Sequence, residues 1–477
     1  MSFANVNVSA SDVQIDAVIK KDVFDDERVI SPTDAIPPAV PPDSNSLLIS
    51  SIGPNPGIAQ VSSFRSLMSF DETIPGPLAA DAFYGLPGEI VGTIEPHTEA
   101  APAALLIQLL VTFGNLAGRS AHFVAEGDRH YPNLFAVLVG ATSKGRKGSS
   151  WGHIKSLMEQ VEPLTGRIQS GLSSGEGLIF AVRDNNHHNG DLGQDDKRLL
   201  VMEPEFASVL KNSSREGNIL SATVRQAWDS GDLRILTKNS PLHATAAHIS
   251  IIGHITKEEL RRYMNATETA NGFANRFVWV FVQRSKLLPE GGSPDPQTIR
   301  ELAGRLKDAL SFAKTVVEVK RDDAAREVWI AVYPQLSEGK LGMFGATTSR
   351  GEAQVMRLAL VYALMDQSSV IRREHLAAAL AVWKLNEDSA RWVFGNAIGD
   401  PVADEILAAL RNTSSGMTRT EIRDLFKRNK TAEQIERSLQ LLLEMNLAKR
   451  YDENTGGRPT ERWFAFTLPF PTTLSKN

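Results

Sequence analysis

A basic, glycine-rich loop between an apolar strand pattern and a helical pattern constrains this chain more than any other feature. The apolar run NLFAVLVG occupies residues 133–140, the loop ATSKGRKG follows it, and the helical pattern SSWGHIKSLMEQVEPL occupies residues 149–164. Glycines allow the backbone to wrap around phosphates, and a helix N-terminus offers N–H donors and the positive end of its dipole. The order of strand, loop and helix therefore predicts a phosphate-binding loop.

The spacing inside this loop departs from the common pattern G-x-x-x-x-G-K-[ST], because Arg146 stands between the second glycine and the lysine. We expect Lys147 to reach the outer phosphates of a nucleotide and the Ser149 hydroxyl to bind Mg²⁺, with Lys144 and Ser150 as the alternatives. A basic loop of this composition is also an ordinary solvated connection, but the flanking strand and helix favour the phosphate site. The residues expected to bind ATP in this loop are Gly140, Lys144, Gly145, Lys147, Gly148, Ser149 and Ser150.

Two carboxylates follow the next apolar strand pattern, RLLVME at residues 198–203. Glu203 ends the pattern, and Glu205 lies two residues further on, on the same face if the chain stays extended. A nucleotide-hydrolysing site needs one carboxylate to hold Mg²⁺ through water and another to polarise the attacking water. We therefore expect both glutamates to be catalytic and Glu203 to serve the metal. The alternative is that they only favour the start of a helix.

Strand and helix patterns alternate up to about residue 290, with further apolar runs HISIIGHI (248–255) and RFVWVFV (276–282). Such alternation predicts an α/β domain in which a parallel sheet carries helices on both faces. Helical periods then fill residues 296–396. Residues 401–466 read as three helices and a hairpin, with Thr418 and Thr431 as caps of the second and third helices.

These patterns divide the chain into four expected parts. The first has a Pro- and Ser-rich composition that disfavours a packed core, so it is expected to be a flexible arm. The parts are the arm at 1–75, a P-loop ATPase core at 76–290, a helical lid at 291–398 and a winged helix-turn-helix domain at 399–477.

Composition narrows the possible chemistry and the compartment. The length of 477 residues allows about two to four domains. The absence of cysteine excludes disulfides, thiolate metal sites and cysteine nucleophiles. The net charge of −5 means that a nucleic-acid site requires a local basic patch. We find no signal-peptide pattern and no apolar run of the ~18–20 residues that span a bilayer, and we expect a cytoplasmic protein without membrane contact. His187 and His188 stand among Asn, Gly and Asp, which favours a solvated loop over a metal site.

A predicted β-hairpin precedes the strand pattern HISIIGHI, because the runs LRILT and LHATA flank a tip that contains Lys238 and Asn239. A lysine at such a tip is suited to contact the phosphates of DNA, although an ordinary solvated tip has the same composition. His254 and Thr256 end the strand pattern and are placed to sense a γ-phosphate or to orient water. Arg276 enters the last strand, where a structural ion pair is the alternative to a catalytic role.

The order of these features resembles the AAA+ helicases of the MCM-like group. In that group a phosphate loop, an acidic strand, a hairpin, a sensor strand and an S-R-F arginine follow one another, and N-R-F stands at residues 275–277 here. The resemblance implies that Arg276 acts on the nucleotide of a neighbouring subunit and that the hairpins line a DNA pore. The segment TSRGEAQVMRLALVYALMD (348–366) resembles the MCM lid, which implies that Arg350, or Arg357 as second choice, reaches a γ-phosphate. Residues 80–395 also resemble P-loop ATPases of phages, plasmids and genomic islands, on the motifs G-F-A-N-R-F and R-S-K-L-L-P-E-G-G.

The C-terminal segment supplies further candidates for DNA contact. A winged helix places its third helix in the major groove and its wing on the phosphate backbone. Arg437 lies in the third helical pattern, and Arg458 and Arg462 lie around the expected wing. The excess of positive charge is slight, so we expect weak and salt-sensitive binding. The alternative is a module that binds only protein.

Together these features predict an ATP-driven DNA helicase or translocase that replicates a mobile element. The expected ligands are ATP and Mg²⁺, and the expected assembly is a homo-hexamer with single-stranded DNA in its pore. The N-terminal arm is a candidate contact for a replication partner. One alternative is a replication initiator or regulator that uses nucleotide only as an assembly switch, and another is a degenerate ATPase domain that serves as a scaffold.

Overall fold

The computed structural model describes most of the chain beyond the predicted arm. The described residues are 74–140, 145–186, 190–236, 242–264, 266–340, 342–395, 397–453 and 460–466. Of the residues singled out in the sequence, those outside these ranges are Lys144, His187, His188, Lys238, Asn239 and Arg458. None of the described helices combines the length and the apolar composition that crossing a bilayer demands.

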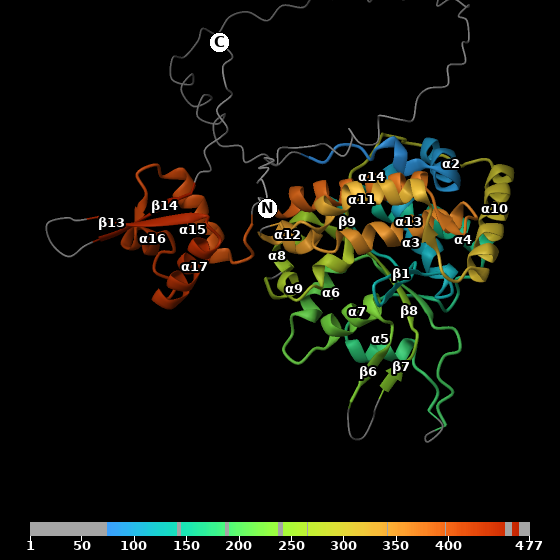
Figure 1. The fold of residues 1–477 in the computed structure, drawn as a ribbon, viewed down its shortest axis with the longest axis horizontal. Helices are drawn as coiled ribbons and strands as arrows, with labels where there is room; N and C mark the ends of the chain where they lie inside the picture. Colours follow the sequence, from blue (N-terminus) through green and yellow to red (C-terminus); the bar gives the residue numbers. More distant parts are fainter. Residues whose placement is uncertain are drawn as a thin grey trace, which may run out of the picture. The chain divides into compact units, whose positions relative to one another are not determined.

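Five parallel strands form one sheet, around which the helices of the larger domain are arranged (Figure 1). Their order is β4-β5-β8-β3-β9, so that β8 lies between β3, which precedes the glycine-rich loop, and β5, which ends at Glu203. The strands are β3 (Phe135–Gly140), β4 (Ile168–Gln169), β5 (Arg198–Glu203), β8 (His248–Thr256) and β9 (Phe277–Val282). The predicted α/β class with a parallel sheet is therefore confirmed.

Helices cover both faces of this sheet, because alternate residues of each strand point to opposite sides. Ala136 and Leu138 of β3 belong to one core with α3 (Pro102–Ala117) and α4 (Lys147–Val161). Val137 and Val139 belong to a second core on the other face. The helices of the second face are α5 (Gly175–Ala181), α6 (Phe206–Ser213), α7 (Leu220–Asp229) and α8 (Lys257–Tyr263).

The helical segment after the sheet shares these cores. Helices α10, α13 and α14 pack in the first core with α3, and the last turn of α14, with Val393 and Phe394, packs in the second. The segment thus completes both cores of the sheet domain. Its elements are α10 (Pro296–Thr315), β10 (Lys320–Arg321), α11 (Asp323–Ser337), α12 (Gly342–Thr348), α13 (Gly351–Met365), β11 (Val370–Ile371) and α14 (Arg373–Phe394).

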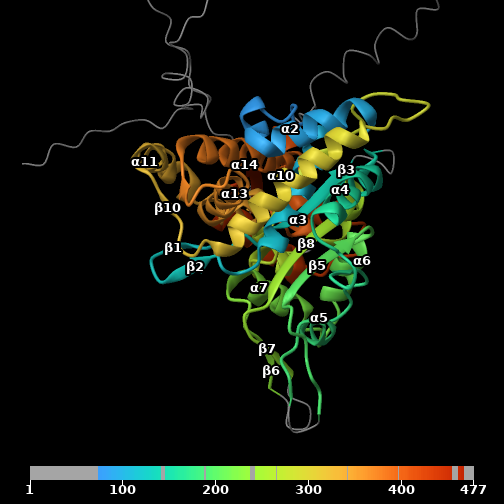
Figure 2. The same cartoon turned by 90° about the vertical axis from the view of Figure 1, so that its right-hand side faces the viewer.

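The hairpin expected before β8 is formed by β6 (Leu233–Ile235) and β7 (Leu242–Ala244), which are antiparallel. It precedes β8 by a short connection and lies at the end of the domain away from α2 (Figures 1 and 2). The remaining elements of the domain are η1 (Ala80–Phe83), α2 (Gly85–Ile94), η2 (Glu95–His97), β1 (Phe123–Ala125), β2 (Asp128–His130), α9 (Ala266–Ala270) and η4 (Ala274–Arg276).

The C-terminal segment has a hydrophobic core of its own, made of residues between 402 and 465. Its antiparallel sheet has the order β12-β14-β13. Thr418 and Thr431 each form a capping box with the residue three positions on, so both predicted caps are confirmed. The elements are α15 (Pro401–Asn412), β12 (Met417–Thr418), α16 (Arg419–Leu425), α17 (Ala432–Glu444), β13 (Ala448–Glu453) and β14 (Thr460–Ala465).

Candidate functional site

The ends of β3, β5 and β8 form the edge of the sheet that we call the carboxyl edge. Gly140 at the end of β3 lies opposite Thr256 at the end of β8, and Glu203 at the end of β5 lies opposite Gly253. The chain leaves β3 towards α4 on one face and leaves β8 towards α8 on the other face. Ligands of open parallel sheets bind where neighbouring strands diverge in this way. The carboxyl edge is therefore the first place to look for a site.

Helix α4 begins at this edge. Arg146, the residue before the helix, has φ 53° and ψ 27°, and its side chain does not cap the helix. Its side chain turns away to Glu99, with Nε 2.5 Å from the carboxylate. A non-glycine residue in the left-handed region is unusual. A helix start without a side-chain cap is suited to bind an anion.

Lys147 lies at the mouth of the loop. A methyl group added to Gly145 would stand 3.8 Å from the Lys147 Nζ, so the amine lies against the loop backbone. Burial lowers the pKa of Lys147, and the nearby carboxylates of Glu259 and Glu205 oppose that shift. The structure thus brings the predicted phosphate lysine and one of the two predicted glutamates together.

The two glutamates after β5 occupy different environments. Glu205 is exposed beside the start of α6, within electrostatic reach of Lys147. Glu203 is only 4% exposed, and its Oε1 accepts a hydrogen bond of 2.6 Å from the Leu172 amide. Burial raises the pKa of Glu203, while the amides of Leu172 and Gly171 oppose the shift. Glu203 is therefore bound to the loop after β4, whereas Glu205 is exposed and lies within electrostatic reach of Lys147.

The two serines of the loop also differ. Ser150 is fully buried, where its Oγ donates to the Lys147 carbonyl at 2.7 Å and accepts from the Gln108 amide of α3 at 2.7 Å. Ser149 is exposed in the first turn of α4, as is Gly148, whose α-carbon has open space around it. Of the two candidates for a metal-binding hydroxyl, Ser149 is therefore the accessible one, and Ser150 joins α4 to α3.

Thr256 caps α8 and introduces a residue that the sequence reasoning did not single out. Its Oγ1 accepts from the Glu259 amide at 3.2 Å and donates to the Glu259 carboxylate at 2.9 Å. This capping box uses the hydroxyl predicted to be catalytic and directs Glu259 towards Lys147. The sequence signal was present as Thr-x-x-Glu at the end of a strand pattern.

His254 lies on β8 between the two halves of this edge. It is only 4% exposed, and its Nε2 finds no hydrogen-bond partner among the described residues. Burial, with a smaller effect of the Lys147 charge, lowers its pKa to about 3, so the imidazole is neutral near pH 7. A buried polar atom without a partner is costly, and a ligand at the carboxyl edge would supply one.

The opposite edge, where β3, β8 and β9 begin, carries the predicted arginines, and we call it the amino edge. Arg276 precedes β9, and its Nη2 lies 2.5 Å from the Asp229 carboxylate. Arg350 reaches the same carboxylate at 3.3 Å, and its guanidinium carbon lies 5.2 Å from the centre of the Trp228 ring. Arg350 therefore lies beside Arg276 and away from the loop of its own chain.

A cavity of about 700 Å³ opens next to these arginines. Arg357 lines it and stacks on the Trp228 ring at 3.6 Å, while its Nη1 donates to Asn133 just before β3. His130 also lines the cavity, and burial together with the Arg357 charge lowers its pKa to about 4. The second-choice lid arginine is therefore a buried structural residue of this edge.

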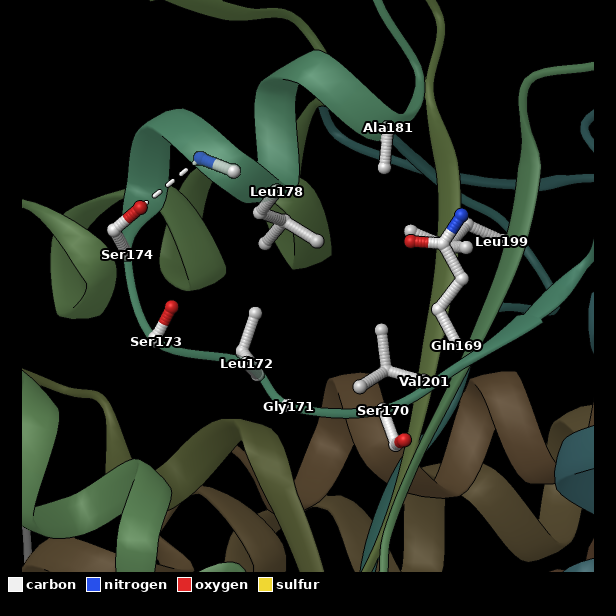
Figure 3. A pocket seen from close by; sticks show the side chains of 11 residues that line it. Gln169, Ser170, Gly171, Leu172, Ser173, Ser174, Leu178, Ala181, Leu199 and Val201 are labelled. Carbon is white, nitrogen blue, oxygen red and sulfur yellow. Dashed lines mark hydrogen bonds between the residues drawn. The ribbon is translucent and has the colours of Figure 1, made fainter.

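Another pocket, of about 220 Å³, lies between α5 and the outer strands β4 and β5 (Figure 3). The side chains that Figure 3 labels are apolar or neutral, and Ser174 is bonded to the Gly177 amide at 3.1 Å. Its described lining thus holds no charge for a phosphate. The carboxyl edge remains the stronger candidate.

The candidates for DNA contact are partly described. Arg437 is exposed on α17, and Arg462 lies on β14.

Among the described residues, no group of three or more His, Asp or Glu side chains is arranged to hold a metal ion. No model of a known protein family matches the chain, and no curated protein matches it. The geometry of the two edges therefore carries the functional argument.

Proposed function

We propose that the protein is an ATP-driven DNA helicase or translocase of AAA+ type. The observation that carries this proposal is the grouping of Lys147, Glu205 and Glu259 at the carboxyl edge, beside the unpartnered His254. A glycine-rich sequence before a helix, a helix start without a side-chain cap and a lysine are the parts that hold phosphates. A facing carboxylate is the part that activates water.

The residues at this edge fit MgATP. Mg²⁺ in nucleotide sites is held by one or two protein oxygens together with the phosphates. Ser149 and Glu205 are the accessible oxygen donors on either side of Lys147. When bound, the ion would neutralise phosphate charge.

The roles of the side chains follow from their surroundings. Lys147 binds the outer phosphates, because its amine lies at the loop mouth. Glu205 accepts a proton from the attacking water, because it is exposed and faces the lysine. His254, neutral at pH 7, offers Nε2 to a phosphate oxygen or to that water. Glu203 fixes the loop after β4 instead of binding the metal.

The position of the arginines supports a ring. Arg276 and Arg350 lie at the amino edge, and β3, with six residues, separates the two edges by about 20 Å at ~3.3 Å per residue. They therefore cannot serve the site of their own chain, and we assign them to the nucleotide of a neighbouring subunit. A closed homo-hexamer gives every site such a neighbour. The β6–β7 hairpin projects from the same domain and is the proposed contact with DNA in the pore.

The C-terminal unit supports DNA contact as a winged helix-turn-helix. Three helices and a sheet of the order β12-β14-β13 around one core agree with that motif. The predicted wing residue Arg458 and the predicted hairpin residues Lys238 and Asn239 remain candidates for phosphate contact.

The ATPase rate with and without single-stranded DNA, measured on the wild type and on Lys147→Ala, tests the proposal. We expect DNA to stimulate the wild type, and Lys147→Ala to lose about 10²–10³-fold in turnover, as when a charge-stabilising group is removed. Lys155→Ala is the matched control, because Lys155 lies on the same helix and only pairs with Glu159 at the surface. Nucleotide binding without turnover would favour the assembly switch, and no nucleotide binding would favour the scaffold.

A further inference from the structure

The C-terminal sheet has one face towards its core and one face away from it. Trp463 of β14 is 1% exposed and lies in the core. Because side chains alternate along a strand, Arg462 and Phe464 point to the outward face. Their partners across the strand pair are Tyr451 and Lys449 of β13, which share that face.

This outward face combines aromatic rings with basic groups. Tyr451 is 54% exposed, and its ring meets that of Phe464 edge-on, with 5.7 Å between the ring centres. The Lys449 Nζ lies 5.3 Å from the centre of the Tyr451 ring. Phe466, which is 45% exposed, lies two residues beyond Phe464 and extends the row. We call Lys449, Tyr451, Arg462, Phe464 and Phe466 the aromatic face.

Helix α17, which is expected to enter the major groove, carries an excess of negative charge, unlike this face of the sheet. The exposed charged residues of α17 are Glu433, Glu436, Glu444 and Arg437, which sum to −2, since one arginine stands against three glutamates. A major groove is bordered by phosphates on both sides, which repel such a surface. Arg437 is therefore a weaker candidate for DNA contact than the sequence implied.

We propose that the aromatic face binds single-stranded nucleic acid, stacking unpaired bases on Tyr451 and Phe464 and holding phosphates with Lys449 and Arg462. Exposed rings beside basic groups are the surface on which unpaired bases stack with little regard to sequence. Duplex bases are already stacked on one another and offer no free ring face. The proposal takes nucleic acid as a ligand from the proposed function, and it adds the surface and the strandedness.

Light-induced crosslinking of the full chain to an iodouracil-substituted oligothymidylate of roughly ten nucleotides tests the proposal. We expect crosslinked peptides that contain Tyr451 or Phe464, and an affinity about tenfold lower in Tyr451→Ala, as base–aromatic stacking implies. Tyr451→Phe should restore binding, because it keeps the ring. With two basic groups, the face contributes a slope of roughly −1.4 in log K against log salt. Arg462→Ala removes one of them and should reduce the magnitude of that slope by about 0.7.

Tyr333→Ala is the matched control, because Tyr333 is an exposed tyrosine on α11 of the other domain, and it should bind like the wild type. An oligouridylate of the same length should bind comparably, and a blunt duplex should bind more weakly. Unchanged binding in Tyr451→Ala, or crosslinks confined to other segments, would overturn the proposal. So would a duplex preference that Arg437→Ala abolishes. The basal ATPase rate, measured without nucleic acid, separates this proposal from the proposed motor function. Tyr451→Ala should leave that rate unchanged. Binding at Tyr451 in a protein without ATPase activity would refute only the motor function.

Discussion

The two edges of the parallel sheet distribute charge in opposite ways. At the carboxyl edge one lysine, Lys147, faces the carboxylates Glu205 and Glu259. At the amino edge one carboxylate, Asp229, is shared by Arg276 and Arg350. In the ring that we propose, contact between subunits would bring the arginines of one amino edge to the carboxyl edge of the next subunit.

The two edges also differ in what positions their charged side chains. Lys147 and Glu205 depend on backbone geometry, because the loop and the strand end position them. Arg276 and Arg350 both pair with Asp229, and their guanidinium carbons lie 5.8 and 5.2 Å from the centre of the Trp228 ring. In a ring, the arginines would exchange Asp229 for phosphate oxygens, which bind guanidinium in the same forked manner.

Removal of Arg276 should have the largest effect on this comparison. An arginine that acts on a neighbour's nucleotide contributes 10³–10⁵ in rate, so we expect Arg276→Ala to lower turnover by about that factor while nucleotide still binds. Steady-state ATPase and nucleotide titration of the purified assembly measure both quantities.

A mixing experiment separates this effect from misfolding, since Arg276 is 5% exposed. Subunits with Arg276→Ala keep an intact carboxyl edge, and subunits with Lys147→Ala keep an intact amino edge. Mixed rings should regain activity at the interfaces that join the two intact edges. Mixtures as inactive as their components would contradict sites shared between subunits.

Glu205 and Glu203 test the carboxyl edge with the same chemical change. Glu205→Gln should lower turnover by about 10²–10⁴-fold, the usual contribution of general-base catalysis. Glu203→Gln should retain most activity, because a glutamine oxygen still accepts from the Leu172 amide. Single-turnover rates at saturating ATP measure both variants, and the reverse ranking would return the catalytic role to Glu203.

Much of this architecture follows from local sequence. The apolar runs at 133–140, 198–203 and 248–255 became β3, β5 and β8 because they are long enough to be buried on both faces. Thr418 and Thr431 cap their helices because the capping box is a pattern of four adjacent residues. The prediction of Lys147 as the phosphate lysine likewise rests on a short stretch of neighbouring residues.

The contacts that the sequence did not indicate join distant segments. Glu203 accepts a hydrogen bond from the amide of Leu172, which lies more than thirty residues earlier in the chain. Glu259 joined Lys147 only because β8 pairs with β3. No local pattern indicates that Asp229 would bind both Arg276 and Arg350.

Acid should destabilise both edges, because each carries buried histidines, with His248 and His130 at the amino edge and His254 at the carboxyl edge. Burial lowers the pKa of His254 to about 3 and that of His130 to about 4, against 6.5 when exposed. The unfolded chain therefore binds more protons below pH 6.5, and the free energy of unfolding falls as pH decreases towards those values. His254 contributes a slope of about 1.4 kcal/mol per pH unit, and His130, which is less buried, contributes less.

Urea unfolding between pH 7 and pH 5 measures these slopes. His254→Asn should flatten the pH dependence more than His130→Asn does. Equal slopes in His254→Asn and the wild type would mean that the pKa of His254 is the same in the folded and the unfolded protein. That result would contradict a buried, neutral His254.

Loss of the Thr256 cap should have the smallest effect, and it distinguishes a structural from a catalytic hydroxyl at the carboxyl edge. Thr256→Ala removes one capping bond, so we expect a loss of about 1 kcal/mol in the free energy of unfolding. Thr256→Ser keeps a hydroxyl and should keep both stability and turnover. Thr418→Ala removes the same kind of cap in the C-terminal unit, where the ATPase rate should not change. If Thr256→Ala lowers turnover far more than its loss of stability explains, and Thr256→Ser does not, then the hydroxyl contributes to catalysis. It would do so by holding Glu259 near Lys147.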